Sequence, residues 1–360
     1  MRKNKTSSVL ILASIFIVIA GIMYASNIVL PILLALFISI ISTQPILWLS
    51  KKKVPYALSV FLVLTGIALI FFIMGGLIGG SLAQFSADAP KYEANLKEMA
   101  GGMIKQLEAL GLEISADKMI QMFDPGKLLN FTAGAVGEIG NIMSDSFLIL
   151  LIVIFILLEL QSFVLKAEVV QITQGKSLKY LNKIGQSIRQ YLSIKTIVSL
   201  LTGVLITVWL WIIGVDYAIL WGLIAFLLNY IPNIGSIIAA VPTMLLALVQ
   251  LGPISMLWTG VGYLAVNMIV GNIIEPKVMG KGLGLSTLVV FLSLIVWGFI
   301  FGAVGMFLSV PLTMSIKIML EENNNTKWVA VLLGTEEDTS KILDQYKEQT
   351  KNAKDSSTDG

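Results

Sequence analysis

Long apolar runs separated by short polar breaks dominate this chain of 360 residues. A membrane-spanning helix needs about 20 predominantly apolar residues. Up to Ile213, each run that approaches this length predicts one span: Val9–Tyr24, Ile28–Leu49, Ala57–Gly80, Ser146–Leu165 and Thr196–Ile213.

Beyond Asp216 the apolar pattern is repeatedly interrupted by Pro, Gly and Asn. Two short apolar arms, 217–231 and 236–250, flank the break NYIPNIG, and a full-length run follows at 254–274. The last run, 283–318, is too long for one helix and short for two full spans. We therefore predict two Pro/Gly-broken helical hairpins, at 217–250 and 283–318; the alternative is that one or both are ordinary pairs of short spans. The pattern predicts an all-α polytopic membrane protein with about eight membrane-embedded elements.

Composition supports the membrane assignment and excludes several kinds of site. The chain is 56% hydrophobic, its mean hydropathy is +0.86, and only 13% of its residues are charged. It has no Cys and no His, which excludes disulfides, thiolate or imidazole metal sites and Cys or His nucleophiles. We predict no cofactor, and the net charge of +3 indicates no nucleic-acid partner.

The distribution of charge predicts which side of the bilayer each segment faces. Basic residues gather at the N-terminus, at Lys51–Lys53 and in the segment 166–195, whereas the segment 81–145 is mainly acidic. Basic loops stay in the cytoplasm. We therefore expect a multi-pass membrane protein with both termini in the cytoplasm.

The same pattern divides the chain into five segments. We expect three N-terminal spans over 1–80, an extracytoplasmic helical cap over 81–145, and a fourth span followed by a basic amphipathic cytoplasmic segment over 146–195. A C-terminal transport core is expected over 196–320, and a polar, partly disordered cytoplasmic tail over 321–360.

The first break in the C-terminal half carries the strongest candidate site. Broken helices persist at membrane depth only where they are buried or line a cavity, and they point to transport sites. Pro232 lacks an N–H, so the Leu228 carbonyl should lose its helical partner. Freed carbonyls and amides can bind a cation or a hydroxylated solute; the alternative is a polar turn at the membrane face. The candidate residues are Asn229, Tyr230, Pro232, Asn233 and Gly235.

The second break, GNIIEPKVMGKG, places charges next to a proline. Glu275 and Lys277 flank Pro276, and Asn272 lies three positions before Glu275, on the same face of a helix. This arrangement predicts a proton or sodium site; the alternative is a structural helix end. Pro311, in the sequence LSVPLTMS, marks a further broken arm.

Several enzymatic activities are excluded by missing motifs. The chain has no G-x-x-x-x-G-K-[ST] sequence for nucleotide binding, no GxGD motif of an intramembrane aspartyl protease and no H-E-x-x-H. We therefore expect that the protein is not an enzyme.

These motifs resemble the autoinducer-2 exporter (AI-2E) family of bacterial membrane proteins. The resemblance covers the chain from Met1 to about Leu320 and is most specific in NYIPNIGSIIAA, in Gly271–Leu292 and in Gly298–Pro311. Ser236 replaces a frequent proline of the family, and Ser286–Thr287 replaces a frequent His-Pro pair. The resemblance implies a transporter and a homo-oligomer. Some members of the family look like sodium/proton antiporters, and others like permeases.

We therefore expect a secondary transporter that exports small polar or organic solutes through the lipid bilayer, with a proton or sodium ion as the possible coupling ion. One alternative is a monovalent cation/proton antiporter that uses Glu275. An alternative of another class is a non-transporting membrane scaffold or assembly factor.

Overall fold

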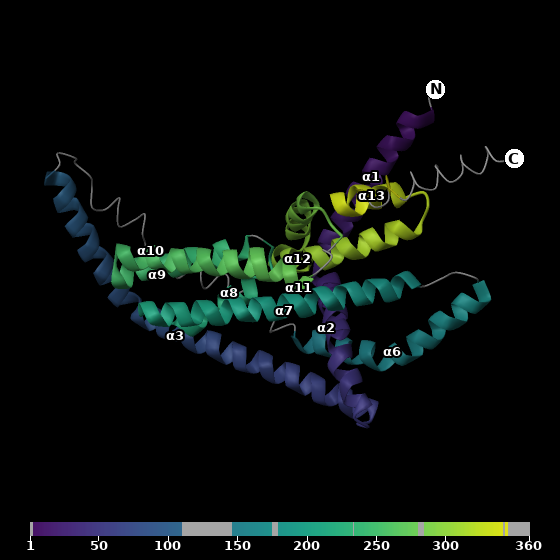
Figure 1. Cartoon of the computed structure of the whole chain (residues 1–360), viewed down its shortest axis with the longest axis horizontal. Helices are drawn as coiled ribbons and strands as arrows, with labels where there is room; N and C mark the ends of the chain where they lie inside the picture. Colours follow the sequence, from purple (N-terminus) through teal and green to yellow (C-terminus); the bar gives the residue numbers. More distant parts are fainter. Residues whose placement is uncertain are drawn as a thin grey trace. The chain divides into compact units, whose positions relative to one another are not determined.

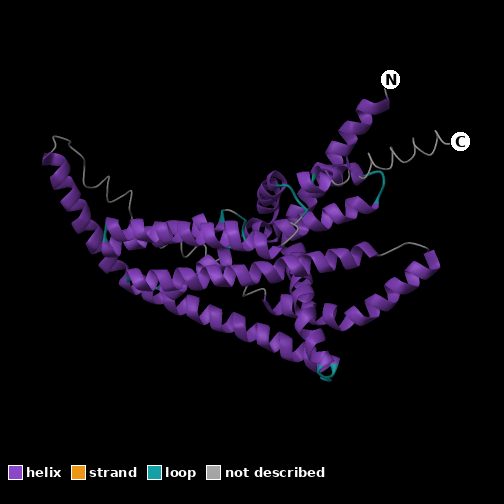
Figure 2. Cartoon of the chain, viewed as in Figure 1, coloured by secondary structure: helices purple, strands orange, loops and turns teal. Residues whose placement is uncertain are grey.

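The computed structural model describes residues 3–109, 146–174, 179–232, 234–279, 284–340 and 343–344. Every secondary-structure element within these ranges is helical (Figure 2), which confirms the predicted all-α class. The chain forms two compact units. Unit 1 comprises Met1–Ile41, Leu158–Ser193 and Met279–Gly360, and unit 2 comprises Ser42–Leu157 and Ile194–Val278.

Figure 1 shows the helices, coloured in their order along the chain. Within the described residues, five helices are long and apolar enough to cross a membrane, or six if the bent pair in α6 counts as one span. The protein is therefore a polytopic helical membrane protein. Its elements are α1 (Lys3–Tyr24), α2 (Ser26–Lys51), α3 (Tyr56–Ala109), α6 (Ser146–Gln174), α7 (Lys179–Ile213), α8 (Ala218–Leu228), α9 (Gly235–Leu251), α10 (Pro253–Val266), the π-helix η1 (Asn267–Ile274), α11 (Glu275–Met279), α12 (Thr287–Glu322) and α13 (Lys327–Leu332).

Two helices extend well beyond the apolar runs that predict them. α3 continues past Gly80 to Ala109, and α7 begins at Lys179 rather than Thr196. The added segments are polar but rich in Ala, Lys, Glu, Gln and Leu, which are strong helix formers, so the change in polarity does not end the helix. The first part of the expected cap therefore belongs to α3, and residues 110–145 lie outside the described residues.

The hairpin expected at 217–250 is formed by α8 and α9 in unit 2. Gly235 lies so close to the end of α8 that a Cβ atom there would stand 1.8 Å from the Leu228 carbonyl oxygen. The Leu228 carbonyl was expected to be free, but it accepts a hydrogen bond from the Ile231 N–H at 2.9 Å. Before Pro232 the chain forms a tighter turn, in which the hydrogen bond spans three residues instead of four, so this carbonyl already has a partner.

The second expected hairpin lies within α12, in unit 1. Gly302 has φ 64° and ψ −148°, which interrupts the helical backbone. Across this point, Trp297 Nε1 donates to Thr313 Oγ1 at 3.0 Å. An unbroken helix would separate these two positions by about 24 Å. The chain therefore reverses direction at Gly302.

The core of unit 2 joins α3, α7, α8, α9 and α10. Trp221 is completely buried in this core, and the Phe85 ring of α3 packs edge-on against it at 6.4 Å between centroids. α7 and α8 approach each other so closely that a Cβ atom at Gly203 would lie 2.7 Å from the Gly222 carbonyl oxygen. Large apolar side chains such as Phe72 and Ile212 remain exposed on the helices. Their exposure suits a surface that faces lipid rather than water.

Unit 1 has its own core, and part of the expected tail is folded onto it. Residues from α2, α7 and α12, including Phe37, Leu192 and Leu308, pack together in this core. The segment after α12 forms α13, and the Leu333 carbonyl that follows it accepts a hydrogen bond from the Ser286 N–H at 3.1 Å. The start of the expected polar tail is therefore ordered, at least up to this contact.

Candidate functional site

A group of polar side chains meets α7 inside unit 2. Three come from α7 itself and three from the two breaks that the sequence singled out. We call this group the α7 polar cluster. Its members are Lys195, Thr196, Ser199, Asn229, Tyr230 and Glu275.

An ion pair is the most unusual part of the cluster. Lys195 Nζ lies 2.7 Å from Glu275 Oε1, and their side chains are only 5% and 18% exposed. Charged groups within membrane-spanning segments are rare and are functional-site candidates by default. The desolvation of a buried pair can exceed its Coulombic gain, so stability alone is a weak reason for this pair to exist.

Two uncharged pairs attach the end of α8 to the same stretch of α7. Asn229 Nδ2 donates to Ser199 Oγ at 3.0 Å, and the Tyr230 hydroxyl donates to Thr196 Oγ1 at 2.7 Å. Asn229 and Tyr230 are both buried. The NYIPNIG break therefore turns its first two polar side chains inward, onto the segment of α7 that also carries Lys195.

The direction of Glu275 depends on a π-helix. Glu275 follows η1 directly, and its N–H bonds the Val270 carbonyl, five positions earlier. Such π-type turns are rare and are frequent at functional sites. One residue added to a helical turn rotates everything after it by about 100°, because an α-helix has 3.6 residues per turn. The π-helix thus contributes to aiming Glu275 at Lys195.

The other predicted site residues occupy different surroundings. Gly235 is buried and permits the close approach of α9 to α8, and Pro232 is half-buried in the turn between them. The exposed residues are Asn272, Pro276 and Lys277. Pro311 is buried inside α12 and belongs to unit 1. Asn233 lies outside the described residues.

Sequence reasoning missed the contribution of α7. Lys195 was assigned to the basic cytoplasmic segment, and neither Thr196 nor Ser199 was singled out. One signal was available: Lys195 and Ser199 are four positions apart, so they share a face of the helix at the start of an apolar run.

Comparison with known proteins places this architecture in a family. A family model described as "AI-2E family transporter" matches residues 11–325. The chain belongs to the AI-2E family. It is 42% identical over 341 residues to a protein of Haemophilus influenzae named "Putative transport protein", covering 93% of this chain and 98% of that one. It is 37% identical over 330 residues to the "AI-2 transport protein TqsA" of Escherichia coli, covering 92% and 96% of the two chains.

A further relative in Escherichia coli, "Putative transport protein YhhT", is 36% identical over 325 residues, covering 90% of this chain and 93% of the relative. With its apolar helices, this AI-2E family member is a multi-pass membrane protein of a bacterial transporter family. The α7 polar cluster lies within the part of the chain that the family model matches.

Proposed function

We propose that this AI-2E family protein is a secondary transporter of the cytoplasmic membrane that exports small polar or organic solutes. The observation that carries the proposal is the buried Lys195–Glu275 ion pair, flanked on α7 by two further polar pairs. The name of the relative TqsA, an AI-2 transport protein, supports a solute of the autoinducer-2 type. Both termini would lie in the cytoplasm.

The cluster suits a solute that carries both hydroxyl and carbonyl groups. Lys195 offers a charged donor and Glu275 a charged acceptor, while Thr196 and Ser199 carry hydroxyls that donate or accept. In the absence of solute these groups satisfy one another, so no charge stands alone at membrane depth. A passing solute would form hydrogen bonds with these groups in place of the bonds that the groups make with one another.

Cation/proton antiport is the second candidate, and Glu275 is the residue that favours it. Its carboxylate is only 18% exposed and lies at the second break. A sodium ion or proton would have to displace Lys195 from this carboxylate, because the two are already paired at 2.7 Å. Sodium-driven proton flux in proteoliposomes, lost in Glu275→Gln, would identify this mode.

The test of the exporter uses the ion pair as a double-mutant cycle. Lys195→Met and Glu275→Gln alone should each lower the melting temperature, since removing one partner of a buried pair costs about 3–5 kcal/mol. The Lys195→Met/Glu275→Gln double variant removes both charges and should recover most of that stability. We expect it to insert normally but to lose efflux of the autoinducer-2 furanone from proteoliposomes.

The matched control is the exposed pair Lys166–Glu159, whose side chains are 66% and 60% exposed. The corresponding double variant, Lys166→Met/Glu159→Gln, should leave both stability and efflux unchanged, because water screens an exposed pair. If Lys195→Met/Glu275→Gln is stable and exports the furanone at the wild-type rate, the cluster is structural and the proposal fails.

A further inference from the structure

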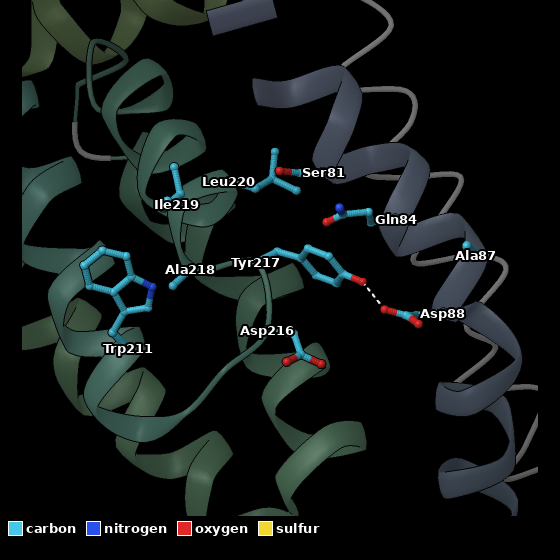
Figure 3. A pocket seen from close by; sticks show the side chains of 10 residues that line it. All are labelled: Ser81, Gln84, Ala87, Asp88, Trp211, Asp216, Tyr217, Ala218, Ile219 and Leu220. Atoms are coloured by element: carbon cyan, nitrogen blue, oxygen red, sulfur yellow. Dashed lines mark hydrogen bonds between the residues drawn. The ribbon is translucent and has the colours of Figure 1, made fainter. Parts of the chain in front are cut away.

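A second polar region of unit 2 lies near the other end of α7, about 24 Å along the helix from Lys195 at 1.5 Å per residue. There α3 meets the turn between α7 and α8, and the structure contains an open cavity of about 490 Å³, whose lining residues Gln84 and Asp88 are exposed. Figure 3 shows Gln84 and Asp88 of α3 pointing toward Tyr217. The polar side chains that line the cavity are Ser81, Gln84, Asp88, Asp216 and Tyr217.

Hydrogen bonds fix the walls of this cavity. The Tyr217 hydroxyl donates to Asp88, and the Tyr92 hydroxyl donates to Asp216 Oδ2 at 2.9 Å. The Asp216 N–H in turn donates to Gln250 Oε1 of α9 at 2.8 Å. Two helices, α3 and α9, and the α7–α8 turn are thus joined around the cavity, which is therefore preformed.

Tyr217, which lines the cavity, has an unusual backbone conformation. Its backbone has φ 57° and ψ 34°, the left-handed region that non-glycine residues rarely adopt. Burial, together with the hydrogen bond to Asp88, raises the pKa of Tyr217 to about 12. The hydroxyl therefore remains protonated at neutral pH and always acts as a donor toward Asp88.

The charge of the cavity is not compensated by the surrounding side chains. Within the described parts of the chain, neither Asp88 nor Asp216 lies within 4.0 Å of a Lys or Arg nitrogen. Each carboxylate accepts one phenolic hydrogen bond there, although an ionised carboxylate has about four acceptor sites. Two negative charges with spare acceptors therefore face a space that is lined elsewhere by Gln84 and Ser81.

We propose that this cavity binds a small organic ammonium compound. Its volume falls within the about 300–1,000 Å³ typical of small-molecule sites and far exceeds what one bare metal ion fills. Acceptor-only carboxylates require a ligand that donates hydrogen bonds, and the uncompensated charge selects a cation over a neutral polyol. The phenol ring of Tyr217 supplies an aromatic wall beside the charge. The inference does not depend on the proposed export function, because equilibrium binding requires no transport.

Calorimetric titration of the full-length protein in detergent tests the proposal. The probes are 1,4-diaminobutane, a dication at neutral pH, and 1,4-butanediol, its neutral counterpart, at constant ionic strength. We expect the diamine to bind and the diol not to bind. Asp88→Asn and Asp216→Asn should each weaken diamine binding by at least about tenfold, the loss expected for one charge-assisted hydrogen bond.

Two control variants separate lost charge from lost folding. Asn keeps an oxygen that can accept from Tyr217 or Tyr92, so both Asp variants should retain the wild-type melting temperature. Glu322→Gln removes one charge from an exposed position of unit 1 and should bind the diamine as the wild type does. The proposal is overturned if the wild type binds no diamine, if the diol binds equally well, or if both Asp variants bind like the wild type.

Discussion

Gly235 shows how a single residue determines the geometry of the candidate site. Its backbone touches the end of α8, and a Cβ atom would stand 1.8 Å from the Leu228 carbonyl oxygen. The six-residue break between α8 and α9 therefore closes tightly enough for Asn229 and Tyr230 to turn inward onto α7. The role of this glycine is steric rather than chemical.

Gly235→Ala should therefore destabilise the protein by about 1–3 kcal/mol, the usual cost of overpacking, because the obstructing atom is backbone and cannot move aside. The control is Gly66→Ala in α3, where a Cβ would meet no atom of the described part of the chain within 4 Å and Ala should be neutral or slightly stabilising. Thermal unfolding in detergent measures both variants. Equal melting temperatures for the two would contradict the steric role of Gly235.

The hydroxyl of Tyr217 gives a prediction about pH. Its pKa is raised from 10.0 to about 12, so its contribution to stability is complete below pH 10 and is lost as the pH rises toward 12. The difference in melting temperature between the wild type and Tyr217→Phe should therefore stay constant up to about pH 10 and shrink above it. A difference that disappears already between pH 7 and pH 9 would show that the hydroxyl does not stabilise the fold in this way.

Among the elements, the α12 hairpin depends most on one backbone conformation. The reversal at Gly302 requires φ 64° and ψ −148°, a combination that side chains disfavour strongly. Its two arms then meet through Trp297 and Thr313. The hairpin is thus built from a conformational requirement at the turn and a side-chain contact between the arms.

Gly302→Ala should lower stability by about 1–3 kcal/mol through backbone strain, although no atom of the described residues obstructs the Cβ position. Gly21→Ala in α1 also has open space around it but lies in helical backbone, so it should not destabilise. The comparison separates backbone strain from side-chain packing. Thermal unfolding of the two variants measures the stability cost of the strain. A Gly302→Ala protein as stable as the wild type would mean that the turn relaxes without cost.

The sequence predicted the elements better than it predicted their contacts. Both hairpins were predictable because Pro, Gly and Asn interrupt apolar helices only where the fold accommodates the break. The C-terminal end of α3 and the N-terminal end of α7 were not predictable, because polar residues such as Lys91 and Lys179 propagate a helix as well as apolar residues do. The partners of Glu275 and Tyr230 were not predictable either, since tertiary contacts with α7 decide them.

On the scale of the whole molecule, one helical face has open space around its glycines. Gly76, Gly79 and Gly80 lie on α3, and among the residues that the structure describes a Cβ at any of them would meet nothing within 4 Å. Small residues at this spacing allow two membrane helices to pack closely. We propose that this face contacts a second copy of the chain, as the expected homo-oligomer would require.

Gly79→Trp should therefore dissociate this proposed homo-oligomer without unfolding the protomer. Gly66→Trp, on the same helix and with equally open surroundings, is the matched control and should keep the assembly intact. Native mass spectrometry from detergent reports the number of subunits, and circular dichroism reports the helix content. An unchanged subunit number in Gly79→Trp would exclude this face as the interface.

The length of α3 has a mechanical consequence. Its residues Tyr56–Ala109 form one helix about 81 Å long, whereas the hydrocarbon core of a bilayer is about 30 Å thick. The α7–α8 turn is hydrogen-bonded to this helix at Asp88 and Tyr92, on either side of Pro90. Pro90 interrupts the helix, and the part Tyr56–Tyr92 has 37 residues, which is about 55 Å at 1.5 Å per residue. This part acts as a lever: tilting it by about 5° about its Tyr56 end displaces the Tyr92 end by about 5 Å. A tilt of α3 that is too small to resolve near Tyr56 would therefore produce, at the far end of the lever, a displacement that a distance measurement can follow.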